Sequence, residues 1–427
     1  MTEDFLHFIW KTKMFNTALI TEENEEIKLI KQGHHNKDGG PDFTNARIKI
    51  GTTIWAGNIE IHIHSSDWYR HSHDGDPKYD NIILHVVYEN DRPVQRRNGE
   101  PIPCLKLKDS FDLGLYAYYL DIIGSDRWVA CQNMIAGMPE IIVNKMLEGM
   151  IIGKFSEKSI FIKNALKKNR NNWEQTFYEQ LARNFGFKIN AEAFEMLAKS
   201  LPMKCLAKHK NNLFQLEALC FGQAGFLKRE YTGEYPKSLQ QEYNHLRQKF
   251  SLIPIDEKLW QFLRLRPTNF PGIRISQFAA LIGNSSHLFT KIIRAKTIKE
   301  LRGYFEVAAS EYWDSHYRFE KKARGRPFPK KIGRNSINLL LINTVIPFIF
   351  IYGDARANNK LKEKAIDYLS KLPAEDNSIL NNWRKTGISI RSALDSQALL
   401  QLKKKYCDRK KCLECQIGNY LLRSFNQ

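Results

Sequence analysis

Residues 59–64, which read IEIHIH, constrain the fold of this chain more than any other stretch. Isoleucine alternates there with Glu60, His62 and His64. Successive side chains of a β-strand point to opposite faces of the sheet, so this alternation predicts a strand with one apolar and one acid–imidazole face. Three isoleucines behind a face of this composition are unusual for a strand that is merely solvated. The face is therefore a candidate site for metal binding or proton transfer.

The flanking residues predict a small sheet around this strand. Alternation over residues 44–50 and 53–64, with a turn at Gly51, indicates a hairpin. Residues 81–88 (NIILHVVY) are typical of a buried strand, and a second hairpin is expected to turn near residues 97–99 and return over 102–107. A helix over residues 2–15 and a strand over 26–30 precede them.

Helical spacing replaces strand alternation from about residue 110 onward. Helices are expected over residues 138–152, 156–168, 173–184, 191–201, 213–226 and 239–250, with short Pro- or Gly-bearing connections. The chain, 427 residues long, is too long for one ordinary core. We therefore predict an α+β protein: an α/β domain with a central mixed sheet at residues 1–130, followed by a large all-α basic region at 131–427.

The cellular setting is expected to be the cytoplasm. The N-terminus begins acidic and lacks the basic stretch and apolar run of a secretory signal. Residues 339–352 form the longest apolar run, but it is short for a membrane span and contains Pro347, which favours a buried, kinked helix. Seven cysteines, an odd number, suit a reducing compartment better than a disulfide framework.

Charge is distributed unequally along the chain. Residues 1–130 carry 15 Lys and Arg against 20 Asp and Glu, whereas the whole chain has a net charge of +19. A basic surface attracts phosphate backbones through Coulomb steering and counterion release, so DNA or RNA is the expected partner of the second region. A Lys-rich surface that is only solvated is the main alternative, and an anionic membrane or an acidic protein is a further one. Arginines and lysines of two segments are the candidate nucleic-acid contacts: Arg264, Arg266, Arg274, Lys321, Lys322, Arg324 and Arg326.

Three residues form the candidate catalytic set. Asp42 and Glu60 offer the hard oxygen ligands that Mg²⁺ or Mn²⁺ requires, and His62 is placed to orient or deprotonate water. The density of histidine nearby keeps a second possibility open, in which imidazoles bind zinc or another transition metal. The candidate ligands of such an ion are His62, His64, His71, His73 and Asp74.

Three cysteines near the C-terminus could hold a separate metal. Cys407, Cys412 and Cys415 lie in the segment YCDRKKCLECQIG, where neighbouring Arg and Lys would favour thiolates. A structural zinc ion or an iron–sulfur cluster would need a fourth ligand from another part of the chain. Free thiols are the alternative.

The order of the predicted elements, with a strand that begins after Pro41-Asp42 and a strand that carries Glu60-Ile61-His62, resembles the PD-(D/E)xK phosphodiesterase superfamily. The resemblance implies a nuclease in which Asp42 and Glu60 hold Mg²⁺ and Glu3 plays the extra acidic role of some members. His62 stands where the superfamily pattern has lysine. Imidazole can accept a proton or bind a metal, but it is not a fixed cation.

Over nearly its whole length, the chain resembles a bacterial family that is common in Bacteroidetes and has no known function. The resemblance rests on the motifs GPDF, GNIEIH, SDWYRHSHD and LHVV, followed by RLRPTNFPGIRISQFAAL and YCDRKKCLECQIG. We expect a metal-dependent nuclease. The alternatives are a non-catalytic nucleic-acid-binding protein and a His/carboxylate metal-dependent hydrolase of a small substrate.

Overall fold

The computed structural model describes residues 1–426, which form two compact units. The sheet unit comprises residues 1–148, 382–388 and 400–427, and the helical unit comprises residues 149–381 and 389–399. The predicted fold class, α+β with a mixed sheet followed by a largely helical region, is confirmed. The division differs from the expected boundary at residue 130, because the sheet unit continues to residue 148 and includes two later segments. The C-terminal segment that carries three cysteines belongs to the sheet unit.

The sheet has seven strands, of which six follow the order β1-β2-β4-β5-β6-β7 and β3 pairs with β4 at one end. Their bounds are β1 (Leu19–Ile20), β2 (Glu26–Lys31), β3 (His34–His35), β4 (Phe43–Ile50), β5 (Thr53–His64), β6 (Ile82–Glu89) and β7 (Cys104–Lys106). β4 and β5 form the predicted hairpin, and Gly51 makes its turn with a φ of 55°. A left-handed φ suits glycine, which has no Cβ to clash.

The second predicted hairpin forms only around its turn, where Gln95 and Pro101 make an antiparallel bridge, and its return strand pairs differently. A turn does form near residue 97, and Gly99 has a φ of 84°. However, β7 pairs with β6 in parallel, with His85 opposite Cys104. β6 also pairs in parallel with β5, which makes the sheet mixed. β6 is therefore an interior strand between two parallel neighbours, in keeping with its almost wholly apolar sequence.

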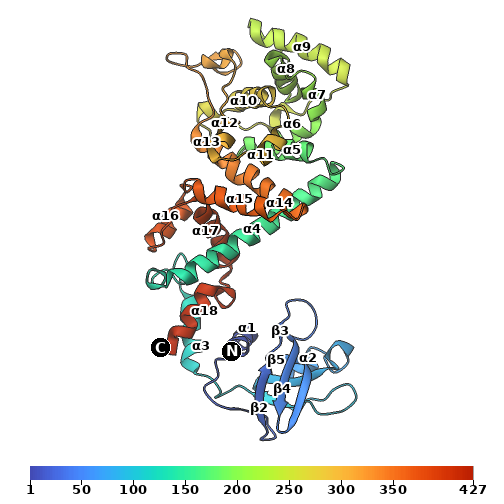
Figure 1. Ribbon diagram of the computed structural model, residues 1–427, viewed down its shortest axis with the longest axis vertical. Coiled ribbons are helices and arrows are strands. Elements are labelled where there is room, and N and C mark those ends of the chain that lie inside the picture. Colours follow the sequence, from blue (N-terminus) through green and yellow to red (C-terminus); the bar gives the residue numbers. More distant parts are fainter. Residues whose placement is uncertain (427) are drawn as a thin grey trace. The chain divides into compact units, whose positions relative to one another are not determined.

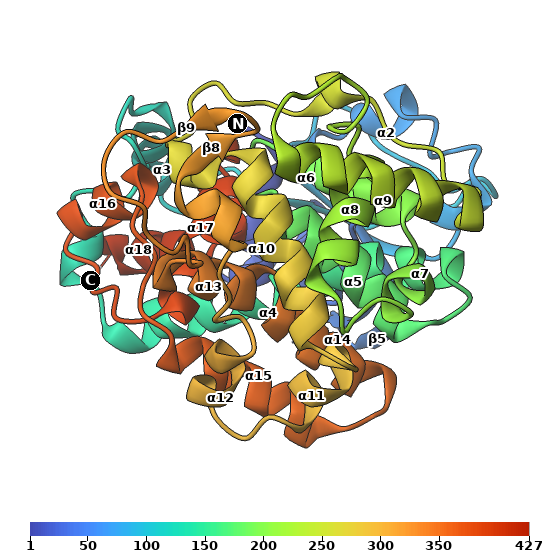
Figure 2. The ribbon, with the colours of Figure 1, turned by 90° about the horizontal axis from the view of Figure 1, so that it is seen from above.

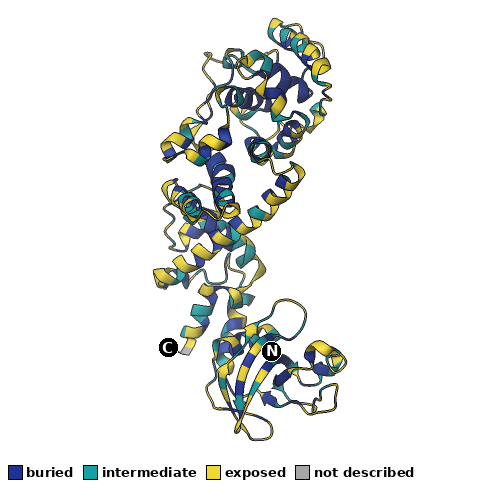
Figure 3. Cartoon of the chain, turned by 45° about the vertical axis from the view of Figure 1, so that its right-hand side comes forward, coloured by how far each residue is buried: buried dark blue, intermediate teal, exposed yellow. Residues whose placement is uncertain are grey.

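The main core of the sheet unit lies between one face of the sheet and helices α1 (Glu3–Thr12) and α3 (Leu113–Gly124) (Figure 1). Phe5, Ile9 and Trp10 of α1 are fully buried there, beside Ile59 and Ile61 of β5. Alternation of buried and less buried positions along β4 is visible in Figure 3. Because the isoleucines of β5 face this core, Glu60 and His62 point to the opposite face of the sheet.

The helical unit contains most of the predicted helices. Their bounds are α5 (Trp173–Phe185), α6 (Ala191–Ser200), α7 (Met203–Ala207), α8 (Leu213–Gln223), α9 (Glu234–Phe250), α10 (Pro271–Asn284), α11 (Leu288–Arg294), α12 (Ile298–Gly303), α13 (Arg334–Leu340), α14 (Ile346–Ala355) and α15 (Asn359–Lys371). Helix α8 packs between α9 and α10 (Figure 2). A two-stranded hairpin, β8 (His316–Arg318) and β9 (Lys321–Lys322), adds the second sheet of the chain.

Three helices contain the division between the units: α4 (Glu140–Lys168), α16 (Ser378–Lys385) and α17 (Ala393–Lys405). α4 is continuous, whereas the sequence predicted two helices separated near Gly153. One stretch, Arg334–Ala355, is long and apolar enough by composition to cross a membrane, and most of it is buried in the helical unit. A π-helical turn, Leu341–Val345, precedes Pro347 and interrupts this stretch, as the predicted kinked and buried helix requires.

Candidate functional site

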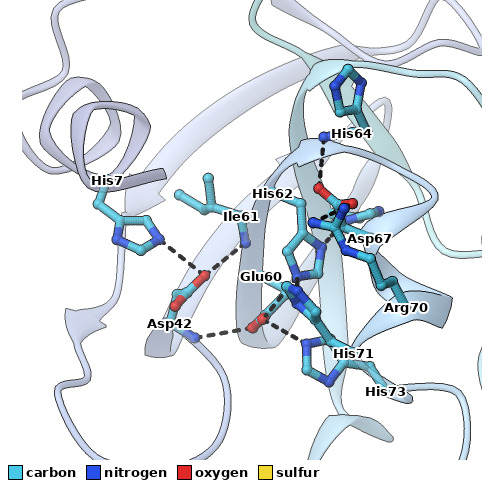
Figure 4. A network of polar contacts seen from close by, with 11 residues as sticks. His7, Asp42, Glu60, Ile61, His62, His64, Asp67, Arg70, His71 and His73 are labelled. Atoms are coloured by element: carbon cyan, nitrogen blue, oxygen red, sulfur yellow. Dashed lines mark hydrogen bonds and ion pairs between the residues drawn. The ribbon is translucent and has the colours of Figure 1, made fainter. Parts of the chain in front are cut away.

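A cluster of carboxylates and imidazoles lies at the sheet (Figure 4). Glu60 and His62 are on the face opposite the main core, whereas His7 reaches Asp42 from helix α1 on the core side. Asp42 immediately precedes β4, and Glu60 and His62 come from β5. His71 and His73 follow the short helix α2 (Asp67–Arg70). α1 adds His7, which is not among the residues predicted from the sequence.

Strand pairing places Asp42 against Glu60. Phe43 lies opposite Ile59 in the β4–β5 ladder, so the residue before β4 meets the next residue of β5. The Asp42 N–H donates to Glu60 Oε2 at 3.1 Å, and the Ile61 N–H donates to Asp42 Oδ2 at 3.0 Å. His7 Nε2 lies 3.1 Å from the same Asp42 oxygen. The predicted delivery of Asp42 to Glu60 by the neighbouring strand is thus present.

His62, His71 and His73 form a group that could hold a metal ion. Each of the three offers one ring nitrogen, and these nitrogens all lie within 4.8 Å of one another in the described part of the chain. His71 Nδ1 lies 3.2 Å from His62 Nε2. Glu60 Oε1 lies beside the group, 3.2 Å from His73 Nε2 and 3.5 Å from His62 Nε2.

The connection after β5 holds His71 and His73 in place. Asp67 is almost fully buried, and its Oδ2 accepts the backbone N–H of His64 at 3.2 Å. The backbone carbonyl of Asp67 accepts the N–H of His71, and the backbone carbonyl of Trp68 accepts the N–H of His73. The ring of Tyr79 stacks on His73 with a centroid separation of 3.8 Å. This packing limits the rotation of the His73 ring, as a metal ligand requires.

Burial controls the charge of the inner histidines. Desolvation, reinforced by His85, His73 and His71, lowers the pKa of His62 to about 2. Desolvation also lowers the pKa of His85 to about 3. Their rings meet at 2.9 Å, His62 Nδ1 to His85 Nε2, which leaves His62 Nε2 facing the histidine group. Both rings are neutral near pH 7, and neutral imidazole is the form that binds metals.

The pKa values of Glu60, His7 and Glu3, around Asp42, are raised. Burial, reinforced by the charge of Asp42, raises the pKa of Glu60, against the effect of its contact with His73. Burial acts to lower the pKa of His7, but the contact with Asp42 and the neighbouring carboxylates outweigh it and raise that pKa. Burial likewise raises the pKa of Glu3, and the charges of Asp42 and His71 also act on Glu3. The residue singled out as an extra acid therefore lies near the site.

His64 does not join the group. It shares a face of β5 with Glu60 and His62 by spacing, but its side chain is exposed at the end of the strand and points away from the other histidines (Figure 4). His85 contacts the histidine group instead, because His85 lies opposite Glu60 in the parallel β5–β6 pair. The only signal for His85 in the sequence is a histidine within an apolar strand, which is more typical of a core residue.

A cavity of about 750 Å³ lies beside Asp42 within the sheet unit. Its charged lining residues, besides Asp42, His7 and His35, are Asp4, Asp38, Glu414, Lys11, Lys37, Arg409, Lys410 and Lys411. Lys37 and Lys411 pair with Glu414 at 2.5 and 2.6 Å. Within the described part of the chain, Lys11, Arg409 and Lys410 have no carboxylate partner. The acidic site is thus bordered by cations from its own unit.

The seven predicted nucleic-acid contacts differ in their surroundings. Arg264 and Arg266 are exposed, as are the four cations of the segment 321–326: Lys321, Lys322, Arg324 and Arg326. Arg274 is buried, and its guanidinium donates to Asn269, Gln277 and Ser336. Burial lowers the pKa of Arg274 to about 10. Since its donors point into the protein, Arg274 has a structural role in place of the predicted contact with nucleic acid.

All seven cysteines are free thiols. Cys407, Cys412 and Cys415 lie in the sheet unit, in the short helical turns Cys407–Arg409 and Cys412–Glu414 and at the start of α18 (Gln416–Arg423). In the described chain, no three cysteine sulfur atoms all lie within 4.8 Å of one another. The C-terminal cysteines therefore do not form a ready-made site for a single ion.

Fold and site define an α+β protein with a histidine–carboxylate cluster on a mixed sheet. The chain belongs to DUF2851, a family described as proteins of unknown function, whose model matches residues 3–378. No curated protein and no solved structure matches the chain significantly. The predicted membership of a family of unknown function is confirmed, while the likeness to PD-(D/E)xK nucleases stays a prediction. The match ends before the C-terminal cysteines.

Proposed function

We propose that this protein is a metal-dependent phosphodiester hydrolase that acts on nucleic acid. One observation carries the proposal: a compact group of three histidines lies directly beside two carboxylates, and a cavity with unpaired cations lies beside one of those carboxylates. Hydrolysis of a phosphodiester needs a metal-activated water, a proton acceptor and positive charge for the phosphate. The residues around Asp42 offer all three.

The histidines favour a transition metal over Mg²⁺. Imidazole nitrogen suits Zn²⁺, Mn²⁺ or Fe²⁺, whereas Mg²⁺ prefers oxygen ligands. Three protein ligands leave a coordination position for water, which is the arrangement of catalytic zinc sites. His71 is exposed, so water and substrate can reach that side of the group. His62, with a pKa of about 2, acts here as a ligand, because so weak a base cannot take a proton from water near pH 7.

Glu60 is the proton acceptor. Its Oε1 lies within 3.5 Å of two of the ligand histidines, and burial raises its pKa toward the range of a working base. Water attacks phosphorus, its proton passes to Glu60, and the P–O bond to the leaving oxygen breaks. His7 has a raised pKa and contacts Asp42, so it supplies the proton that the leaving oxygen takes up. A bound metal would polarise the water and a phosphoryl oxygen.

The cavity beside Asp42 supports an anionic substrate. Lys11, Arg409 and Lys410 line it, and none of them has a carboxylate partner among residues 1–426, so their charges are available to phosphate. Arginine can bind phosphate through two parallel N–H donors, and lysine acts as a point charge. Successive phosphates of a nucleic-acid strand would engage such cations, with an affinity that falls as salt rises.

The test pairs two exposed histidines of the same segment. His71→Ala removes a member of the metal group, whereas His64→Ala removes one that lies outside it. Metal content and affinity for Zn²⁺ and Mn²⁺ are measured together with cleavage of single- and double-stranded DNA and RNA. Loss of a residue that merely orients a ligand weakens metal binding by about 10- to 100-fold. The His71 variant should lose at least as much, together with cleavage, while the His64 variant retains both.

Three results would contradict the proposal. A wild-type protein that binds no transition metal lacks the proposed centre. A metal-loaded protein that binds nucleic acid without cleaving it is a non-catalytic binding protein. A metal-loaded protein that hydrolyses only small phosphoesters is a hydrolase of another class of substrate.

A further inference from the structure

A fourth cysteine, distant in sequence, lies with the three C-terminal ones. Cys131 is close enough to Cys412 and Cys415 for their charges, after burial, to act on it and raise its pKa to about 12. The charges of Cys131, Cys415 and Cys412 act in turn on Cys407. All four residues belong to the sheet unit. The surroundings of the other three cysteines differ: glutamates act on Cys104 and Cys220, and Cys205 and Cys220 both act on Tyr178 of the helical unit.

Packing holds the Cys131 loop against the C-terminal segment. Trp128 meets Trp383 edge to face with a centroid separation of 5.0 Å, and Lys403 lies over the Trp128 ring at 5.1 Å. Tyr118 and Phe425 stack at 5.0 Å, and the Tyr118 hydroxyl contacts the sulfur of Met134. These contacts fix the backbone on both sides of the four thiols.

The C-terminal loop is shaped around its sulfur atoms. The Cys415 N–H donates to the Cys412 carbonyl at 3.2 Å, which closes a tight turn that carries both thiols at the start of α18. A Cβ on Gly418 would lie 2.2 Å from the Cys412 carbonyl oxygen, so only glycine permits this close approach. The Asn419 side chain donates to two carbonyls of the same loop, those of Leu413 and Cys415.

We propose that Cys131, Cys407, Cys412 and Cys415 hold an iron–sulfur cluster. Burial raises the pKa of all four cysteines, so they stay protonated without a metal, and a cationic centre would bind them as thiolates. The spacing separates two candidate centres. Tetrahedral zinc, with Zn–S bonds of about 2.3 Å, brings its sulfur ligands to about 3.8 Å from one another. No three of these four sulfur atoms lie within 4.8 Å of one another, which leaves room for several metal atoms between them.

The cluster would organise the cationic border of the cavity beside Asp42. Arg409, Lys410 and Lys411 lie between Cys407 and Cys412, and all three line that cavity. Lys410 adopts a left-handed φ of 51°, which is strained for lysine and persists only if its surroundings hold it. Metal ligation on both sides of this short loop would supply that constraint.

The experiment uses the full-length protein, purified without oxygen and also reconstituted with Fe²⁺ and sulfide. Iron, acid-labile sulfide and zinc are quantified per chain, and visible absorption and electron paramagnetic resonance are recorded after reduction. We expect iron and sulfide in equal amounts, up to about four of each per chain for a four-cysteine cubane cluster. Cys131→Ala and Cys412→Ala should lose the absorption and the iron. Cys104→Ala, at a buried cysteine of the same unit, should retain both.

The wild-type measurement decides the question even if a variant fails to fold. One zinc per chain without iron or sulfide would overturn the cluster in favour of a zinc site. A reconstituted protein without a bound metal would show that the four thiols hold none. Full iron content in folded Cys131→Ala would remove Cys131 from the set of ligands.

Discussion

Replacement of His85 by phenylalanine tests whether the histidine group is a metal site without altering a ligand. His85 is fully buried on β6, and its Nε2 lies 2.9 Å from Nδ1 of His62. This contact fixes the tautomer of His62 and directs Nε2 toward His71 and His73. Phenylalanine fills a similar volume between Trp68 and His62 but cannot accept a hydrogen bond. We expect metal affinity to fall about 10- to 100-fold, or about 1.4–2.7 kcal/mol.

The same substitution should leave the metal-free protein nearly unchanged. His85 Nδ1 is buried without a hydrogen-bond partner, so its removal relieves a desolvation penalty. His62 Nδ1 loses its partner at the same time, which costs a similar amount. With wild-type protein at a metal concentration of 100 times its Kd, binding adds about 2.7 kcal/mol to the free energy of unfolding. The variant should gain only about 0.4–1.4 kcal/mol at that concentration.

Urea unfolding with and without Zn²⁺ or Mn²⁺ measures both quantities, and calorimetric titration gives the affinity directly. His64→Ala is the control, since His64 is exposed and lies outside the group. An affinity equal to that of the wild type in the His85 variant would refute the inference that His62 Nε2 binds the metal under the control of His85. Equal loss of stability with and without metal would show that His85 contributes only to packing.

Three further predictions concern stability. Metal-free protein should lose stability as pH falls from about 6.5 toward 3, because His62 and His85 stay neutral when folded and take up protons only when unfolded. The free energy of unfolding, measured with urea at several pH values, should fall by on the order of 1 kcal/mol per pH unit for each histidine. Gly418→Ala should lower the melting temperature and the iron content, whereas Gly124→Ala, with nothing within 4 Å of the new Cβ, should change neither. Arg274→Ala should lower the free energy of unfolding in urea by about 2–3 kcal/mol and leave the salt dependence of DNA binding unchanged.

Local pattern was sufficient to predict the strand hairpin that supports the site. Alternation over β4 and β5, with a glycine at the turn, specified both strands to within one residue. Local pattern also misled in two places. Gly153 suggested a break, but one glycine costs about 1 kcal/mol and a helix of 29 residues tolerates it. The turn near Gly99 was real, yet the pairing of β7 depends on its contacts with β6, which no local signal encodes.

The candidate site was predictable only where its residues share a strand or a turn. Glu60 and His62 follow from alternation, and Asp42 follows from the pairing of consecutive strands. His7 and His85 reach the site through the packing of α1 and the parallel register of β6, and neither position has a distinctive local pattern. The identity of the proposed fourth cysteine could not be predicted from the sequence for the same reason. Cys131 is far from Cys407 in sequence, and the two belong to one unit only in the folded chain.

Counting charges along the sequence separated an acidic N-terminal region from a basic remainder and so suggested that cleavage and substrate binding occupy different domains. An acidic site repels phosphate, and at physiological salt a cation farther away than about 8 Å offsets that repulsion only weakly. A phosphodiesterase site built on Asp42 and Glu60 therefore needs positive charge close by. Arg409 and Lys410 supply it, because the C-terminal segment belongs to the sheet unit and lines the same cavity as Asp42. Under the proposed function, substrate binding at the site would therefore depend first on this C-terminal segment, whose cations lie in the same unit as Asp42 and Glu60.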